Sequence, residues 1–407
     1  MLGLLALSPL HTKIAGLLWV LSGLTAAWWS WRSRHDPGMA DTVSRAAWQW
    51  WLSCCVTLAL WQGMAWYWRE PCCDYTSDLN AALRWWLGAL ATYGLVRHWR
   101  GQAGWHAPID HALALAGLCS LLVVLTHDRH ELPSYPIPWS AGVAMLTVLL
   151  FPQALHAPPG SWQRRVWLAG CLAAVLAVLL SQSRGTYVLL AWMVYHWARH
   201  LTAGAHWRQA LRPLLAAGLL FTGIVASGLL PSDPLRMREG WNDIAASWRE
   251  ANYNTSLGGR FALYQLAADT VVESPWTGVG ARERLHRIAQ LGLDQPEPQR
   301  SLLSHARQQG HVHNAYLHNA MDGGLPGLAG FLMTVFGLLI AARSLQATHP
   351  VGSQQLQGLA FVHALASISN VNHAHNYYVV MLALCVMTVF VLARSQPLSS
   401  QAQQASG

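Results

Sequence analysis

The chain has 407 residues, of which 53% are hydrophobic and only 11% are charged, whereas soluble domains carry roughly 25% charged residues. A single water-soluble core is therefore excluded, and most of the chain should face lipid. The net charge of +8 does not indicate nucleic-acid binding, because the Lys and Arg residues lie in short connectors between apolar runs and form no continuous patch.

Apolar runs long enough to cross a hydrocarbon core of about 30 Å recur along the chain. Eight precede a long polar stretch and three follow it; we predict spans at 14–31, 46–68, 80–97, 109–127, 136–155, 164–182, 185–200 and 211–230, then at 325–342, 354–371 and 376–394. The short apolar run 1–10 counts as a truncated or tilted first span, which gives about 12 in total. It lacks the basic region and cleavage site of a signal peptide, so we expect it to be retained.

The charges of the connectors predict the orientation of the chain. Four connectors are rich in arginine and should be cytoplasmic by the positive-inside rule; they are 32–45, 97–100, 164–165 and 199–212. The alternation then puts the long polar stretch on the outer side of the membrane. We predict an all-α polytopic bundle in four parts: an N-terminal transmembrane bundle (1–230), an outer loop with short helices (231–312), C-terminal transmembrane helices (313–394) and a disordered cytoplasmic tail (395–407).

The loop 231–312 is much longer than usual connectors, and such loops are often functional. Apolar residues recur at helical spacing in 241–249 and in 260–272, which predicts short helices lying over the membrane face.

Arg184 interrupts two apolar runs in Ser181-Gln182-Ser183-Arg184-Gly185, where the chain must turn. A guanidinium beside a glycine turn is well suited to bind a phosphate through two parallel hydrogen bonds. A snorkelling arginine at a helix end is the ordinary alternative.

Arg260 follows Gly258-Gly259 in the outer loop. We expect this glycine pair to lie just before a helix, where its backbone N–H groups would attract an anion. A solvated arginine on a loop helix is the alternative. The segment runs on to Ser274-Pro275-Trp276-Thr277-Gly278-Val279-Gly280.

Two clusters of histidine and asparagine lie near predicted span ends: 311–319, which reads His-Val-His-Asn-Ala-Tyr-Leu-His-Asn, and 370–376, which reads Asn-Val-Asn-His-Ala-His-Asn. Ionisable groups at a water–lipid boundary are functional candidates. The first cluster is compatible with a metal pair, a polar lid or a proton-transfer site. The second either lines the same site or caps a helix.

These elements together resemble a known family. The order is Ser-Arg-Gly at a span end, Gly-Arg and Ser-Pro-x-x-Gly-x-Gly in a large outer loop, and His-x-His-Asn-x-Tyr-Leu before a Gly-rich turn into a span. It resembles the O-antigen ligase and polymerase superfamily over the central and C-terminal parts of the chain. The resemblance implies a C-type glycosyltransferase-like fold, with Arg184, Arg260 and His313 as the functional residues. Because His occupies both motif positions, His311 can share or take the role of His313.

In this family a ligase moves a finished glycan from undecaprenyl diphosphate onto lipid A-core, without a metal. No Asp-x-Asp or Asp-Asp-x-x-Asp motif for Mg²⁺ is present in the chain, and we expect no cofactor. Arg184 and Arg260 would meet the charge on the leaving diphosphate. His313 would act as general base in an inverting attack by the acceptor hydroxyl.

Further substrate contacts are expected beside the base and along the loop, at His311, Asn314, Arg282, Arg284 and Arg287. The arginines would steer the anionic acceptor, although a solvated loop face explains them equally well. The expected partners are the lipid-linked glycan, lipid A-core and membrane lipids. An O-antigen polymerase or a protein O-oligosaccharyltransferase would use the same class of donor. A His-lined transporter is less favoured, because transporters usually place carboxylates inside spans.

Overall fold

The computed structural model describes residues 8–33, 35, 41–69, 77–99, 106–202, 219, 223, 233 and 235–395. Within these ranges the chain forms α-helices and short 3-10 turns and contains no strand. The predicted all-α class is therefore confirmed for the described residues. The span expected at 211–230, most of the short first span and the tail 396–407 lie outside them.

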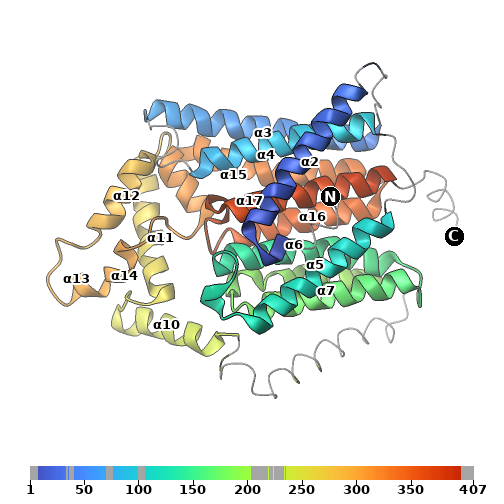
Figure 1. Ribbon diagram of the computed structural model, residues 1–407. Helices are drawn as coiled ribbons and strands as arrows, with labels where there is room; N and C mark the ends of the chain where they lie inside the picture. The colour runs from blue at the N-terminus through green and yellow to red at the C-terminus, as the bar shows by residue number, and fades with distance from the viewer. Residues whose placement is uncertain are drawn as a thin grey trace.

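Helices of the described residues form a bundle that makes up the larger part of the molecule, with α2 crossing it obliquely (Figure 1). They are α2 (Thr12–Arg32), α3 (Thr42–Tyr67), α4 (Ser77–His98), α5 (His106–Thr126), α6 (Pro136–His156), α7 (Trp162–Leu180), α8 (Leu189–Thr202), α15 (Ala315–Leu345), α16 (Pro350–Ala366) and α17 (Asn376–Ser395). Their positions agree with the predicted spans, with ends that differ by a few residues. The exception is α15, which begins ten residues before the span predicted at 325–342.

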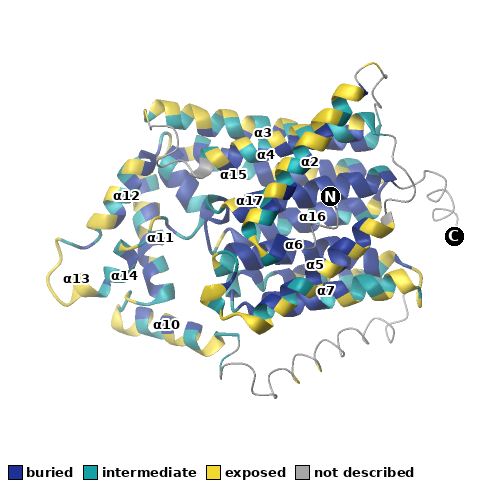
Figure 2. Ribbon diagram, in the orientation of Figure 1, coloured by how far each residue is buried: buried dark blue, intermediate teal, exposed yellow. Residues whose placement is uncertain are grey.

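Six described helices are long and apolar enough to cross a membrane: α2, most of α5, α6, α7, α15 and α17. The central ones are α6 and α17, in which 94% of the most apolar window is buried, whereas α2 has only 22% buried. Figure 2 shows the same contrast, because exposed residues mark the outer faces of α2, α3 and α5. The exposed side chains on α5 include Leu115, Leu118, Leu122 and Leu125, as expected for a surface in contact with lipid.

Five shorter helices gather at one end of the bundle (Figure 1). They are α10 (Met237–Glu250), α11 (Ser256–Glu273), α12 (Gly280–Gln290), α13 (Gln299–Leu302) and α14 (Ser304–Arg307). They share a small apolar core, separate from that of the bundle, which includes Leu263, Ile288, Ala306, Val312 and, from α15, Met321. The helices predicted at 241–249 and 260–272 are thus confirmed, and this core explains why the long connector is ordered.

A break in α15 joins these loop helices to the bundle. Gly324 has φ 59° and ψ −151°, a conformation that interrupts the helix and is essentially restricted to glycine. The freed backbone is bound by the preceding loop, because Leu325 N donates to Pro275 O and Val279 N donates to Met321 O, both at 2.8 Å. The Ser-Pro-x-x-Gly-x-Gly and Gly-Gly elements of the sequence are therefore joined by backbone hydrogen bonds.

Candidate functional site

Arg184 lies in the 3-10 turn η4 (Arg184–Thr186) between α7 and α8. Thr186 anchors this turn to α6 through Ser140, with 2.7 Å between the two hydroxyl oxygens. The half-buried guanidinium reaches the start of α10, where Nη1 donates to Arg236 O at 2.9 Å. It also lies against the backbone of Gly240, and a Cβ at that position would collide with it. Arg184 therefore does not snorkel away into solvent.

Arg260 lies on α11, but the local structure differs from the prediction. The helix begins at Ser256, capped by Thr255, whose Oγ1 accepts from Gly258 N at 3.0 Å. Gly258 and Gly259 are buried inside the first turn, and Gly259 N donates to Thr255 O. The expectation of free N–H groups before the helix was wrong, because Thr255 starts the helix earlier and occupies those donors. The glycines instead allow close packing against Tyr253 and His305.

Arg236 was not anticipated from the sequence and completes a group of three arginines. It caps the start of α10 in the left-handed conformation, with φ 53°, and its guanidinium pairs with Glu239. Burial, and also the positive charges of Arg184 and Arg236, lower the pKa of Arg260, whereas Tyr264 and Asp243 oppose this shift. Arg184 and Arg236 thus place positive charge near Arg260, although Glu239 pairs with Arg236, and positive charge of this kind attracts anions.

His313 lies between the loop helices and the bundle. It has φ 55°, and its half-buried ring is held at both nitrogens: Nδ1 is 3.0 Å from Asn370 Oδ1 and Nε2 is 2.9 Å from Gln309 Oε1. The hydroxyl of Tyr264 lies 2.9 Å from the carbonyl oxygen of His313. Tyr264 is one turn after Arg260 on α11. The same helix therefore positions the Arg260 guanidinium and, through Tyr264, the backbone of His313.

The histidine rings of the two clusters meet at this point. His311 and His313 have ring centroids 4.2 Å apart, and His311 is 6.2 Å from His375 of the second cluster. Asn370 provides the direct contact with His313. The second cluster therefore packs against the first; that it lines a common site, one of its two predicted roles, stays a prediction. A further ring, His318, lies 6.5 Å from His311.

Asn314 and three arginines were predicted to bind substrate. Asn314 caps α15, because its Oδ1 accepts from Tyr316 N and Leu317 N at 3.0 and 3.1 Å. Arg284 is only 4% exposed and pairs with Asp322 at 2.7 Å, which holds α12 against α15. Arg287 pairs with Glu273 and Glu283 at 2.6 and 3.0 Å. Arg282 is exposed. A steering role for these arginines stays a prediction.

The surroundings of His313 disfavour a positive charge on its ring. Burial, followed by the charge of Arg260, lowers the pKa of His313 to about 3. Burial and the neighbouring rings also lower the pKa of His311, and burial lowers the pKa of His375 to about 4. All three rings are therefore neutral near pH 7. Among the described residues, no group of three or more His, Cys, Asp or Glu is placed to hold a metal ion.

Comparisons with known proteins agree with the motifs. A family model described as O-antigen ligase matches residues 169–332, a range that contains Arg184, Arg260 and His313. The chain is also 27% identical over 178 residues to the O-antigen ligase of Escherichia coli strain K12. That match covers 42% of this chain and 39% of that protein. The resemblance to the O-antigen ligase family is confirmed over this central region.

Proposed function

We propose that this chain, whose residues 169–332 match the O-antigen ligase family, is a glycosyltransferase of the inner membrane. It would transfer a glycan from undecaprenyl diphosphate to lipid A-core on the periplasmic face. The observation that supports this proposal is the arrangement of Arg184, Arg260 and His313, which lie on separate elements yet within electrostatic reach of one another, Arg184 of Arg260 and Arg260 of His313.

The arginines would bind the diphosphate of the donor. A diphosphate bond to the glycan already stores the driving energy, so the enzyme must only position the reactants and stabilise the charge that leaves. Guanidinium groups form strong charge-assisted hydrogen bonds with phosphate oxygens. Arg184 and Arg260 supply these donors, and Arg236 adds positive potential beside them, although its own guanidinium is already paired with Glu239. Stabilisation of this kind requires no divalent ion.

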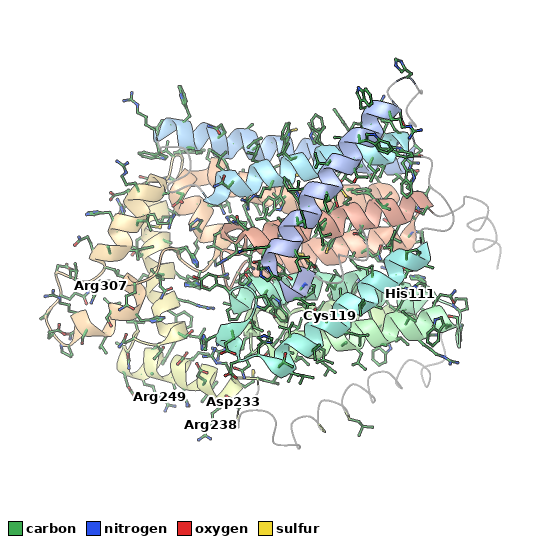
Figure 3. The ribbon with its side chains drawn as sticks, viewed as in Figure 1. His111, Cys119, Asp233, Arg238, Arg249 and Arg307 are labelled. Carbon is green, nitrogen blue, oxygen red and sulfur yellow. The ribbon has the colours of Figure 1, made fainter. Side chains whose placement is uncertain are left out.

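His313 would accept the proton of the acceptor hydroxyl. The oxygen then attacks the anomeric carbon on the side opposite the diphosphate, and the configuration at that carbon inverts. A neutral imidazole within reach of the hydroxyl provides general base catalysis. The exposed arginines of the loop helices would attract an anionic acceptor. Figure 3 shows two of them, Arg238 and Arg249, on the side of α10 turned away from the bundle.

The decisive experiment is reconstitution of the purified protein in liposomes with lipid-linked glycan, lipid A-core and EDTA. Product that carries the glycan on lipid A-core supports the ligase. Lengthening of the lipid-linked glycan without any lipid A-core product would indicate a polymerase instead. Transfer to a protein acceptor alone would indicate an oligosaccharyltransferase, and no transfer to any acceptor would contradict the proposal.

A further inference from the structure

Both ring nitrogens of His313 face an amide oxygen, Nδ1 at 3.0 Å from Asn370 Oδ1 and Nε2 at 2.9 Å from Gln309 Oε1. A neutral imidazole has one N–H donor and one acceptor, whereas an imidazolium has two donors. Two facing oxygens can both be satisfied only by the protonated ring. The pair of amides thus matches the form that His313 takes after it has accepted a proton.

Each amide is held in this orientation by another contact. Asn370 is 2% exposed, and its Nδ2 donates to Asn372 Oδ1 at 3.0 Å. Gln309 Nε2 donates to the carbonyl oxygen of His305 at 3.2 Å. Turning either amide over would bring two oxygens together, which is unfavourable. The oxygens are therefore directed at the imidazole by the surrounding structure.

The resting ring is nevertheless neutral. The charged and titratable groups that face it come from every neighbouring element: Arg260 on α11, His305 on α14, His311 in its own loop and His375 before α17. Burial, followed by the charges of Arg260, His305 and His375, lowers the pKa of His313 to about 3, whereas the hydrogen bond with Asn370 opposes this shift. With Nδ1–H donated to Asn370, the lone pair is on Nε2, and the contact with Gln309 Oε1 is satisfied only once a proton arrives there.

We propose that Gln309 and Asn370 are positioning residues that together bind the imidazolium form of His313 during transfer. This inference rests on the proposed ligase function. The acceptor oxygen bonds to the anomeric carbon as the bond from that carbon to the diphosphate oxygen breaks, and the electron pair leaves with the diphosphate. The hydroxyl proton passes to His313 Nε2. The new N–H donates to Gln309 Oε1, Nδ1–H stays on Asn370, and the proton is later released to water.

The position of Gln309 also affects the order of acceptor binding and proton transfer. Its oxygen occupies the side of the ring that the acceptor hydroxyl must approach, so the Gln309 side chain must leave this place when the acceptor enters and return when the proton has moved. Asn370 is less free to move, since it is only 2% exposed whereas Gln309 is half-buried. Asn370 selects the tautomer, and Gln309 stabilises the product of proton transfer.

The test compares Gln309→Leu and Gln309→Glu with Gln308→Leu, which alters the exposed neighbouring residue. Loss of one hydrogen bond to a charged group should lower kcat of Gln309→Leu about 10- to 100-fold, with little change in KM for the lipid-linked donor. Gln309→Glu places a carboxylate beside the imidazolium, so the acid limb of its kcat profile should move to higher pH by about 1 unit or more. Gln308→Leu should behave as the unmodified protein.

The outcomes separate this inference from the proposed function. If Gln309→Leu keeps full activity, or if Gln309→Glu shows an unshifted pH profile, Gln309 does not bind the imidazolium and the inference is overturned. If Gln309→Leu fails to fold, the isosteric Gln309→Glu decides through its profile alone. If His313→Ala still transfers glycan, the proposed base itself is wrong. The inference alone is refuted when His313→Ala is inactive while either Gln309 variant behaves as the unmodified protein.

Discussion

Gly240→Ala should inactivate the protein without unfolding it. Gly240 is buried on α10, and a Cβ there would collide with the Arg184 guanidinium. The obstacle is the far end of a flexible side chain, so the arginine moves and the helix does not. Alanine even favours a helix over glycine by about 1 kcal/mol. A displacement of about 1 Å in a group that positions substrate can lower turnover about 10²-fold, and we expect a fall in kcat of that size.

The assay is glycan transfer in liposomes, with thermal unfolding in detergent measured in parallel. Gly63→Ala is the matched control, because Gly63 also lies in a helix and its Cβ would meet nothing within 4 Å. In an Arg184→Ala background the Gly240→Ala change should lower kcat almost no further, since both substitutions remove the same interaction. Full activity of Gly240→Ala, or an additive loss in the double variant, would show that this contact does not position Arg184 for transfer.

Three further predictions follow from the same geometry. His313→Ala should lower kcat about 10²- to 10⁴-fold with little effect on donor binding, whereas the reverse pattern, with only His311→Ala inactive, would assign the base to the first histidine. Transfer should continue in EDTA, because arginines stabilise the leaving diphosphate; loss of activity that Mg²⁺ restores would contradict this. Gly324→Ala should destabilise the protein by about 2 kcal/mol or more, measured as a lower unfolding temperature than that of Gly323→Ala, whose Cβ meets only the Met64 side chain.

The helices could be predicted from the sequence because the long spans and the loop helices both have strong patterns of apolar residues. The long spans differ from the observed helices mainly at their ends, and the loop helices were visible as periodic apolar residues. The glycine pair before Arg260 was misinterpreted because the helix, capped by Thr255, starts at Ser256, four residues earlier than expected. A threonine is a weaker indication of a helix start than two glycines are of a break, so the residue order favoured the wrong starting point.

The partners of the site residues could not be predicted, because they depend on how distant segments pack. Asn370 is 57 residues from His313 in the chain, and Arg236 is 52 residues from Arg184. The second His-Asn cluster gave a signal for Asn370, but its spacing alone did not show which ring it would contact. Gln309 gave no signal, since a glutamine in a polar loop is usually solvated.

In the proposed mechanism, Arg260 would link donor binding to the strength of the base. In the free protein burial, followed by the charge of Arg260, lowers the pKa of His313 to about 3, so the neutral imidazole is a weak base. A bound diphosphate would bring negative charge to the arginines and cancel much of this effect, which would raise the pKa of His313. The acid limb of kcat, which reports the complex, should therefore lie at higher pH than the limb of kcat/KM, which reports the free protein. Coincident limbs would mean that the diphosphate and the imidazole are not electrostatically coupled.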